Sequence, residues 1–564
     1  MKAIVKVKNL IGMSYNIFKK NHKMKNISSS ILPIKIMFTV FLLALLFSSC
    51  QKSENESIGN SEAKLKINLS VGQPDEEKIL VGSKNTVKRS TDSKIQKSEV
   101  KLGNGISMEV SVIEGNIPNS YNKESPSVNS ESRAASQTIT KTLEKDVKYR
   151  LAVYSEAGQY LQAQDYSYGN EASIPGLQLD AGKTYTFVIY SVNSKSELPQ
   201  IDNKDDITTA NLKDISGDLM FFKKTMKLNF GDNNLDAVLQ HKFSQITTYI
   251  EMDDSMTGSI ESITGAFFNP TKSFGTIKFS DGNLSFPNTS MNSAVTFPSI
   301  SPGSRTVISN SSLLISPTTT TASFNIGSIR IDSETKTNIS VPEIKITPGH
   351  KYNLIIKFRS CSEDVTAEGM NWSYPQTTWK VWDFWTGYTT YSGIYKNDEN
   401  RYYKDNEVIE NTFVAPQANY GFQFDITELD NAFNMRVNGK HIFKASDLEQ
   451  IQFETASSLG IVRNIQFADG SDYATNGIPQ IYNMKGSLAT PLIRILISRN
   501  GEVTMLGSKT NNGPLFPLKL KNNLTFNKVL WNSTGNNTVV VTQKVAGRTI
   551  IIGKGSGKKR ISCK

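Results

Sequence analysis

The chain has 564 residues, 38% of them hydrophobic, and a formal net charge of +11. This length is sufficient for roughly two to four domains with separate cores. The many Ser, Thr, Asn and Gly residues between short apolar runs are typical of a turn-rich β protein and exclude a helical bundle. Residues 1–49 hold eight lysines and no acid, so the chain from Cys50 onward carries a net charge of only +3. Such a balance leaves no strongly basic surface, and we expect no nucleic-acid partner.

The first predicted element is a secretory signal peptide at residues 1–49. Its apolar run, Ile36–Phe47, follows a lysine-rich stretch and is followed by small residues, which is the order of a secretory leader. A membrane-spanning helix needs about 20 apolar residues, and this run is shorter.

Cys50 comes directly after Ser48 and Ser49, and this order resembles the lipobox of bacterial lipoproteins, although Phe47 stands where that motif prefers Leu. The resemblance implies that Cys50 is acylated, with palmitate among the acyl chains, and that lipid holds the chain at the cell outer membrane. Residues 50–62 are then a tether. The other interpretation is an ordinary signal peptide with a cysteine after it by coincidence.

Strand-like runs follow along the whole chain, recognised by alternating or continuous apolar character. They are Lys64–Val71, Ile106–Glu114, Lys183–Val192, Phe243–Met252, Lys351–Phe358, Leu492–Arg499 and Asn537–Gly553. Residues 83–100 and 115–137 have almost no large apolar side chain and predict long surface loops or disordered insertions. We therefore expect an all-β fold.

Two segments repeat one pattern, namely a turn ending in Gly, then Tyr, then an alternating strand. They are Leu179–Tyr190 and Ile346–Phe358, with Gly182 and Gly349 at equivalent positions. Gly permits a tight turn, and the strand after it turns alternate side chains toward a core. The repeat predicts tandem β-sandwich domains at residues 63–222 and 223–365.

A third β-rich domain is predicted at residues 366–564, where all five tryptophans lie. Trp379, Trp382 and Trp385 are candidate ligand-binding residues, since their rings, together with those of Tyr374, Tyr388 and Tyr391, can form an aromatic platform for a sugar ring. In a continuous strand Trp379 and Trp385 would share a face and Trp382 would oppose them. The alternative is that the three rings pack in a core or cover a domain junction.

The last residues of the chain carry a basic cluster, which predicts a solvated, mobile terminus; the alternative is that the cluster contacts phosphates or anionic lipid. Two cysteines remain besides Cys50, and whether Cys361 and Cys563 form a disulfide stays open, because a mobile tail argues against it.

The Ser-Ser-Cys leader, the repeated Gly-x-x-Tyr strands, Gly217–Phe222 and Leu239–Met252 together resemble the Bacteroidetes fimbrillin family of pilus proteins, over roughly residues 50–365. The resemblance implies two β-sandwich domains, export as a lipoprotein, and removal of an N-terminal segment by an arginine-specific protease. It also implies β-strand addition from other pilus subunits. Arg89 and Arg133, in polar segments, are the candidate processing sites. The alternative is that both are ordinary loop arginines in a subunit that is never cut.

The sequence contains no HExxH, GxSxG or paired metal-ligand spacing. We therefore expect no enzyme, no cofactor and no metal site. Acidic residues within Phe422–Phe443 leave a calcium site as an alternative without EF-hand spacing.

We thus predict a surface lipoprotein of fimbrillin type, a structural or adhesive pilus component in which the third domain favours an accessory, anchor or tip role over a shaft role. Its expected partners are other pilus subunits, the outer membrane through the lipid anchor, and a glycan or host-surface ligand. The alternative function is a surface glycan-binding lipoprotein of a nutrient-uptake system.

Overall fold

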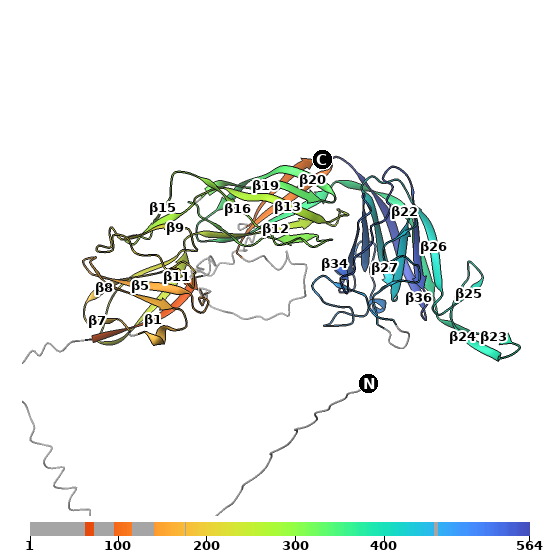
Figure 1. Cartoon of the computed structure of the whole chain (residues 1–564), viewed down its shortest axis with the longest axis horizontal. Helices are drawn as coiled ribbons and strands as arrows, with labels where there is room; N and C mark the ends of the chain where they lie inside the picture. Colours follow the sequence, from red (N-terminus) through yellow and green to blue (C-terminus); the bar gives the residue numbers. More distant parts are fainter. Residues whose placement is uncertain are drawn as a thin grey trace, which may run out of the picture. The chain divides into compact units, whose positions relative to one another are not determined.

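The computed structural model describes residues 62–72, 95–115, 140–174, 176–317, 319–455 and 461–563 (Figure 1). These residues form strands throughout, with two 3-10 turns, η2 (Glu171–Ser173) and η4 (Ile481–Asn483), and no α-helix in the ranges given. The prediction of an all-β fold is confirmed. Among these residues no helix is long and apolar enough to cross a membrane.

The first sandwich is built on an eight-stranded sheet in the order β4-β1-β11-β10-β8-β5-β6, with β7 also paired to β1. Its β1 and β11 run parallel. The strands are β1 (Glu62–Gly72), β4 (Thr140–Lys141), β5 (Lys148–Ser155), β6 (Tyr160–Ser167), β7 (Gln178–Asp180), β8 (Thr184–Ser191), β10 (Met220–Lys227) and β11 (Gly231–His241). A small sheet completes this sandwich, with strands β9 (Asn211–Ile215), β14 (Gly275–Lys278) and β15 (Leu284–Ser285).

The central strands β5 and β8 are buried along almost their whole length, because both faces of the large sheet are covered. On one face Leu151 joins Leu235 of β11 in a buried cluster. On the other face Tyr190 packs against Phe279, which follows β14, with ring centroids 5.8 Å apart. Continuous apolar sequence is what a strand covered on both faces requires.

The second sandwich pairs a six-stranded sheet, β17-β12-β21-β3-β2 with β18 on β12, with a four-stranded sheet, β16-β13-β19-β20. Their inward side chains form one buried cluster that includes Val110, Ile250 and Phe324. The strands are β2 (Ile95–Gly103), β3 (Ile106–Glu114), β12 (Ser244–Met252), β13 (Ile260–Thr271), β16 (Met291–Ala294), β17 (Thr306–Ile308), β18 (Ser312–Leu314), β19 (Thr319–Ile331), β20 (Glu334–Ile346) and β21 (Lys351–Ser360).

Strand pairing crosses the predicted boundary near residue 222 in both directions. Strand β3 pairs with β21 and so belongs to the second sandwich, whereas β11 pairs with β1 in the first. The prediction of a loop over 83–100 is wrong from Ile95 onward, because β2 pairs with β3 there. As the edge strand of its sheet, β2 turns many polar side chains to solvent, which hid it from an apolar-pattern search.

The repeated segments form β8 in the first sandwich and β21 in the second. The glycine of each turn is left-handed, with φ of 83° at Gly182 and 82° at Gly349, a conformation that glycine adopts without steric strain. The repeat therefore marks equivalent turn-and-strand units, as predicted.

The C-terminal sandwich faces a seven-stranded sheet, β22-β36-β27-β32-β33-β34-β31, with a five-stranded sheet, β26-β35-β28-β29 with β30 on β28. Phe413 of β26 stacks on Phe424 of β27 across the two sheets, at 5.8 Å. The strands are β22 (Ser362–Tyr374), β26 (Val408–Ala415), β27 (Gly421–Leu429), β28 (Ala432–Val437), β29 (Lys440–His441), β30 (Ile451–Gln452), β31 (Ile465–Phe467), β32 (Ile493–Ser498), β33 (Val503–Ser508), β34 (Leu515–Leu520), β35 (Asn537–Lys544) and β36 (Thr549–Arg560).

The predicted single strand over 537–553 is in fact two strands, β35 and β36, separated by a turn with Gly547 at φ 73°. Strand β36 continues to Arg560, so the prediction of a mobile basic tail is wrong. Lys558 pairs with Asp364 at 2.5 Å and Lys559 with Glu363 at 3.3 Å, both acids lying on the neighbouring β22.

Cys361 and Cys563 form a disulfide that links the β21–β22 connection to the residues after β36. The expectation that argued against this bridge rested on a mobile tail, which the strand pairing of β36 rules out.

The turn between β19 and β20 contacts the C-terminal sandwich. Glu334 pairs with Arg499 at 2.7 Å and with Arg560. Beside it Asp332 is fully buried, and this burial raises the pKa of its carboxyl to about 7 against the opposing effects of Tyr420 and nearby arginines. The two sandwiches therefore share a buried, charged junction.

Candidate functional site

A cluster of exposed aromatic side chains lies on a three-stranded sheet that we name the aromatic hairpin, consisting of β23 (Thr377–Asp383), β24 (Gly387–Lys396) and β25 (Arg401–Lys404). Figure 1 shows β23 and β24 as a hairpin at the edge of the sandwich that carries β22 and β36. Its ladder runs without a break from Thr377 opposite Gly393 to Asp383 opposite Gly387.

The base of the aromatic hairpin is fixed to the C-terminal sandwich. Ile394 and Tyr403 are buried members of the sandwich core. The buried Lys396 forms an ion pair with Glu399 and lies 5.7 Å from the centre of the Trp372 ring. Hydrogen bonds from Lys396 and Tyr403 lower the pKa of the Glu399 carboxyl. The base is thus packed and charge-paired, which makes the hairpin a stiff support.

One face of the hairpin carries a chain of stacked rings. Trp379 stacks on Tyr402 with centroids 4.6 Å apart, and Tyr402 lies 4.8 Å from Tyr395. Lys404 Nζ lies 3.8 Å from the centre of the Tyr391 ring. These side chains cover each other, so this face stabilises the sheet itself.

The tip of the hairpin is different, because its large side chains contact little else. Exposure is 59% for Trp382, 72% for Phe384, 87% for Trp385 and 71% for Tyr388. Trp382 lies directly opposite Tyr388 on the ladder, and Phe384 meets both tryptophans edge to face, at 6.2 and 5.2 Å. We name these four residues the aromatic tip.

The turn that presents the aromatic tip is held by Asp383. Its Oδ1 accepts hydrogen bonds from the backbone N–H of Trp385 at 2.9 Å, from the N–H of Thr386 at 3.0 Å and from the Thr386 hydroxyl at 3.1 Å. These bonds lower the pKa of the Asp383 carboxyl. An Asp that caps its own turn in this way replaces the strand pattern with a tight bend.

The structure separates the three predicted tryptophans. Trp379 belongs to the stacked face, whereas Trp382 and Trp385 join the aromatic tip. Trp385 does not share a face with Trp379, because the strand ends at Asp383. The core-packing alternative is wrong for Trp382 and Trp385, which are exposed. The sequence analysis did not include Phe384 among the candidate residues. The turn-forming Asp383 within the run from Trp382 to Trp385 could have indicated that these rings lie together at a turn.

A second notable feature is β1, which is held by one long ladder. Nine consecutive residues, Ala63 to Val71, pair with β11, while β7 and β4 pair only with the two ends of β1. Its inward Leu65, Ile67 and Leu69 are only partly buried against the core. A cavity of about 560 Å³ opens along its middle, lined partly by residues 67–70 and 236–238.

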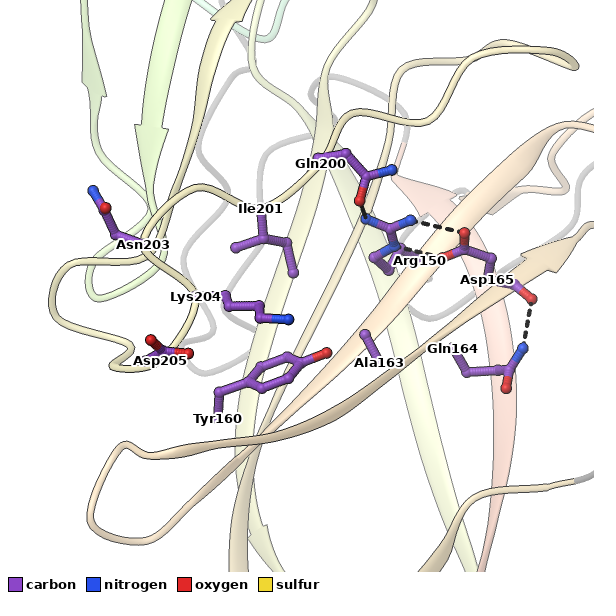
Figure 2. A pocket seen from close by; sticks show the side chains of 10 residues that line it. All are labelled: Arg150, Tyr160, Ala163, Gln164, Asp165, Gln200, Ile201, Asn203, Lys204 and Asp205. Atoms are coloured by element: carbon purple, nitrogen blue, oxygen red, sulfur yellow. Dashed lines mark hydrogen bonds and ion pairs between the residues drawn. The ribbon is translucent and has the colours of Figure 1, made fainter.

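A polar cavity of about 610 Å³ lies in the first sandwich beside β6 (Figure 2). Arg150 donates to Asp165 from Nε and Nη2 and to Gln200 Oε1 at 2.9 Å from Nη1, and the bond to Asp165 raises the pKa of the guanidinium. Lys204 Nζ lies 5.0 Å from the centre of the Tyr160 ring. These polar and charged groups hold a loop against the sheet. The N–H groups of the Arg150 guanidinium already donate to acceptors within the protein.

The remaining predicted site residues fall elsewhere. Cys50, Arg89 and Arg133 lie outside the described residues. In the segment weighed as a calcium site, Asp425 pairs with Arg494 at 2.7 Å. Across the described residues no group of three or more metal-ligating side chains converges.

No known protein family matches the sequence, and no curated protein matches it either. Solved structures that match include a candidate cell-adhesion protein from Bacteroides fragilis, with 12% identity, a TM-score of 0.27, and coverage of 42% of this chain and 93% of that one. A fimbrial assembly protein from Parabacteroides distasonis matches with 10% identity, a TM-score of 0.24, and coverage of 46% and 90%. The fimbrial anchor protein Mfa2 from Porphyromonas gingivalis matches with 11% identity, a TM-score of 0.23, and coverage of 33% and 71%. At these TM-scores the function of the present chain has to be argued from its own residues.

Proposed function

We propose that this chain is a cell-surface lipoprotein of fimbrillin type, anchored in the outer membrane through Cys50, that works in a pilus as an accessory, anchor or tip component and has no enzymatic activity. The observation that carries the proposal is the position of β1, a strand paired along one edge and open along much of the other.

Withdrawal of β1 would leave a groove suited to another strand. The inward residues of β11, namely Leu235, Ala237 and Leu239, are fully or almost fully buried, and β1 covers them with an alternating apolar face. Outside the core, β1 is held by exposed polar contacts, such as Lys66 with Asp232 at 3.0 Å and Asn68 with Asp236 at 2.7 Å. An incoming strand with the same alternation satisfies both the ladder and the groove, which is β-strand addition.

The sheet pairing gives a reason to favour one of the two candidate processing sites. Of the strands that the structure describes, a cut at Arg89 separates only β1 from the rest of the chain. A cut at Arg133 also separates β2 and β3, and β3 is an interior strand of the second sandwich that contributes four buried apolar residues to its core. We therefore propose Arg89 as the cut that frees β1 without breaking a second core.

The test is strand exchange after cleavage. The chain with Arg133→Ala is treated with an arginine-specific protease, and a labelled peptide with the sequence of residues 62–72 is added. We expect the cleaved chain to bind the peptide and the uncleaved chain not to bind it. Fluorescence anisotropy measures the binding.

The matched control is the same peptide with Asp in place of the residue corresponding to Ile67, which cannot fill the groove. A cleaved chain that binds neither peptide, or both equally, contradicts the proposal. A chain resistant to cleavage at Arg89 but readily cut at Arg133 contradicts the choice of site.

A surface glycan-binding lipoprotein of a nutrient-uptake system is the second candidate, and the exposed rings of Trp382 and Trp385 are the observation that favours it. A glycan array that loses its signal on Trp385→Ala, with no effect on pili, would support this candidate instead.

A further inference from the structure

We propose that the aromatic tip (Trp382, Phe384, Trp385 and Tyr388) binds the interfacial layer of a lipid bilayer. This inference rests on the adhesive role proposed above and names the surface that the hairpin contacts. The acyl chains on Cys50 would hold the chain to its own membrane, whereas the aromatic tip offers a second, protein-built contact with lipid.

The aromatic tip exposes a contiguous group of rings. Four rings lie within seven residues, each more than half exposed. Single exposed apolar residues are ordinary on protein surfaces, but a contiguous aromatic group marks an interaction site. Burial of one such side chain is favourable enough to change an association constant by roughly tenfold or more.

The shape of the aromatic tip selects the partner. Phe384 meets Trp382 at an interplanar angle of 81° and Trp385 at 89°, so neighbouring rings do not form one flat surface. A sugar stacks on a flat ring and needs converging polar groups, yet the carboxylate at the turn, Asp383, already caps its own backbone. Exposed rings set at right angles to one another fit a partner that surrounds them, and Trp and Tyr are the residues enriched at membrane interfaces.

The polar groups of the aromatic tip suit a position among the lipid headgroups. The β23–β24 ladder satisfies the facing backbone groups, and Asp383 satisfies the amides of the turn, so entry into the interface leaves few of these groups without a partner. The lowered pKa of Asp383 keeps its carboxylate charged, which limits the tip to headgroup level. Lys380 is exposed on the face that carries Trp382, where its long side chain can reach phosphates.

The aromatic tip is held away from the sandwich by a hairpin with a fixed base. The seven residues of β23 extend about 23 Å at 3.3 Å per residue. The base is fixed by the buried Ile394 and Tyr403. A stiff arm of this length presents its rings without ordering a loop on binding, which keeps the entropic cost of association low.

The test uses a chain that begins at Gln51, which carries neither signal peptide nor acyl chain. It retains the compact unit Ser61–Lys564 that contains every described strand. Binding to phosphatidylcholine vesicles is measured by sedimentation, and insertion by quenching of tryptophan fluorescence with brominated lipid. Phe384→Ala/Trp385→Ala is compared with Phe230→Ala, which removes a ring that is 77% exposed in the first sandwich.

We expect the unmodified chain and Phe230→Ala to bind vesicles alike, and the double variant to bind at least tenfold more weakly. No vesicle binding by the unmodified chain at millimolar lipid overturns the inference, and so does equal binding by the double variant. A chain that binds oligosaccharides or a protein through the tip but not vesicles overturns it as well. Peptide exchange at β1 is unaffected by these variants, so failure of the vesicle test is distinct from failure of the proposed pilus role.

Discussion

The hydroxyl of Tyr352 accepts a hydrogen bond from the backbone N–H of Thr347 at 2.8 Å. The equivalent bond in the first sandwich joins Tyr185 to the N–H of Asp180 at 3.1 Å. Each Tyr is buried and lies three residues after the left-handed glycine of its turn. The same hydrogen bond therefore occurs in both copies of the repeated sequence. In each copy the Tyr of the strand binds the turn that precedes it.

Replacement of Tyr352 or Tyr185 by Phe is expected to lower the free energy of unfolding by about 1 kcal/mol each, because the acceptor for a partly buried N–H is lost. Urea unfolding followed by fluorescence checks this. Tyr388→Phe, at an exposed position, is the control and should stay within about 0.5 kcal/mol of the unmodified chain. Equal stability of all three variants would contradict the role of the bond.

The disulfide between Cys361 and Cys563 closes a loop across 202 positions. In the chain-entropy model a loop of this length contributes about 5 kcal/mol by restricting the unfolded chain. Cys361→Ser/Cys563→Ser is expected to lose up to that amount in urea unfolding, and reduction of the unmodified chain should have the same effect. A midpoint that reductant does not change would contradict the prediction, and Cys50→Ser serves as the control.

Stability should depend on pH through Asp332 and Asp430, because burial raises the pKa of each carboxyl to about 7, from 3.8 in an unperturbed chain. The folded chain therefore binds these protons more tightly than the unfolded chain. The resulting stabilisation is complete below pH about 4 and is lost as the pH rises through about 7.

Urea unfolding at pH 5 and pH 8 is expected to show higher stability at pH 5, and Asp332→Asn/Asp430→Asn should reduce the difference. Asp383→Asn is the matched control, because the exposed Asp383 has a lowered pKa and titrates below this window. A stability that rises from pH 5 to pH 8 in the unmodified chain, and does so equally in the double variant, would show that these carboxyls do not govern it.

We propose the Cys50 thiol as the site of acylation, so acylation is expected to be lost in Cys50→Ala. Labelling of cells with radioactive palmitate, followed by membrane fractionation, measures it. Cys361→Ser should keep its label. An unmodified Cys50 thiol in the mature chain, shown by mass spectrometry, would contradict the lipoprotein assignment.

Much of the strand content was readable from local alternation, because side-chain period in a strand is a property of neighbouring residues. The predicted strand Ile106–Glu114, for example, coincides with β3. Pairing partners were not readable, because β3 and β21 meet across more than two hundred residues. The prediction that the basic tail is mobile was wrong for the same reason, because the acidic residues that pair with it lie far away in sequence, on β22.

The candidate site was predicted in part. The tryptophan-rich segment was found from composition, and Trp382 and Trp385 are exposed, whereas their role in ligand binding stays a prediction. The grouping of the rings was not predictable, because the hydrogen bonds of Asp383 end the strand one residue before Phe384. A single turn thus moved Trp385 from the face of Trp379 to the tip.

The Cys361–Cys563 bridge also has a mechanical consequence for a chain exposed to flow or pulling. Tension entering at residue 361 and leaving beyond residue 563 travels through two sulfur atoms rather than through the polypeptide between them. The polypeptide between the two cysteines has a contour length of about 700 Å, at roughly 3.5 Å per residue. This length cannot be extended while the disulfide is intact. The aromatic hairpin lies inside this closed ring, so a pull between those two points cannot unravel the module that presents it.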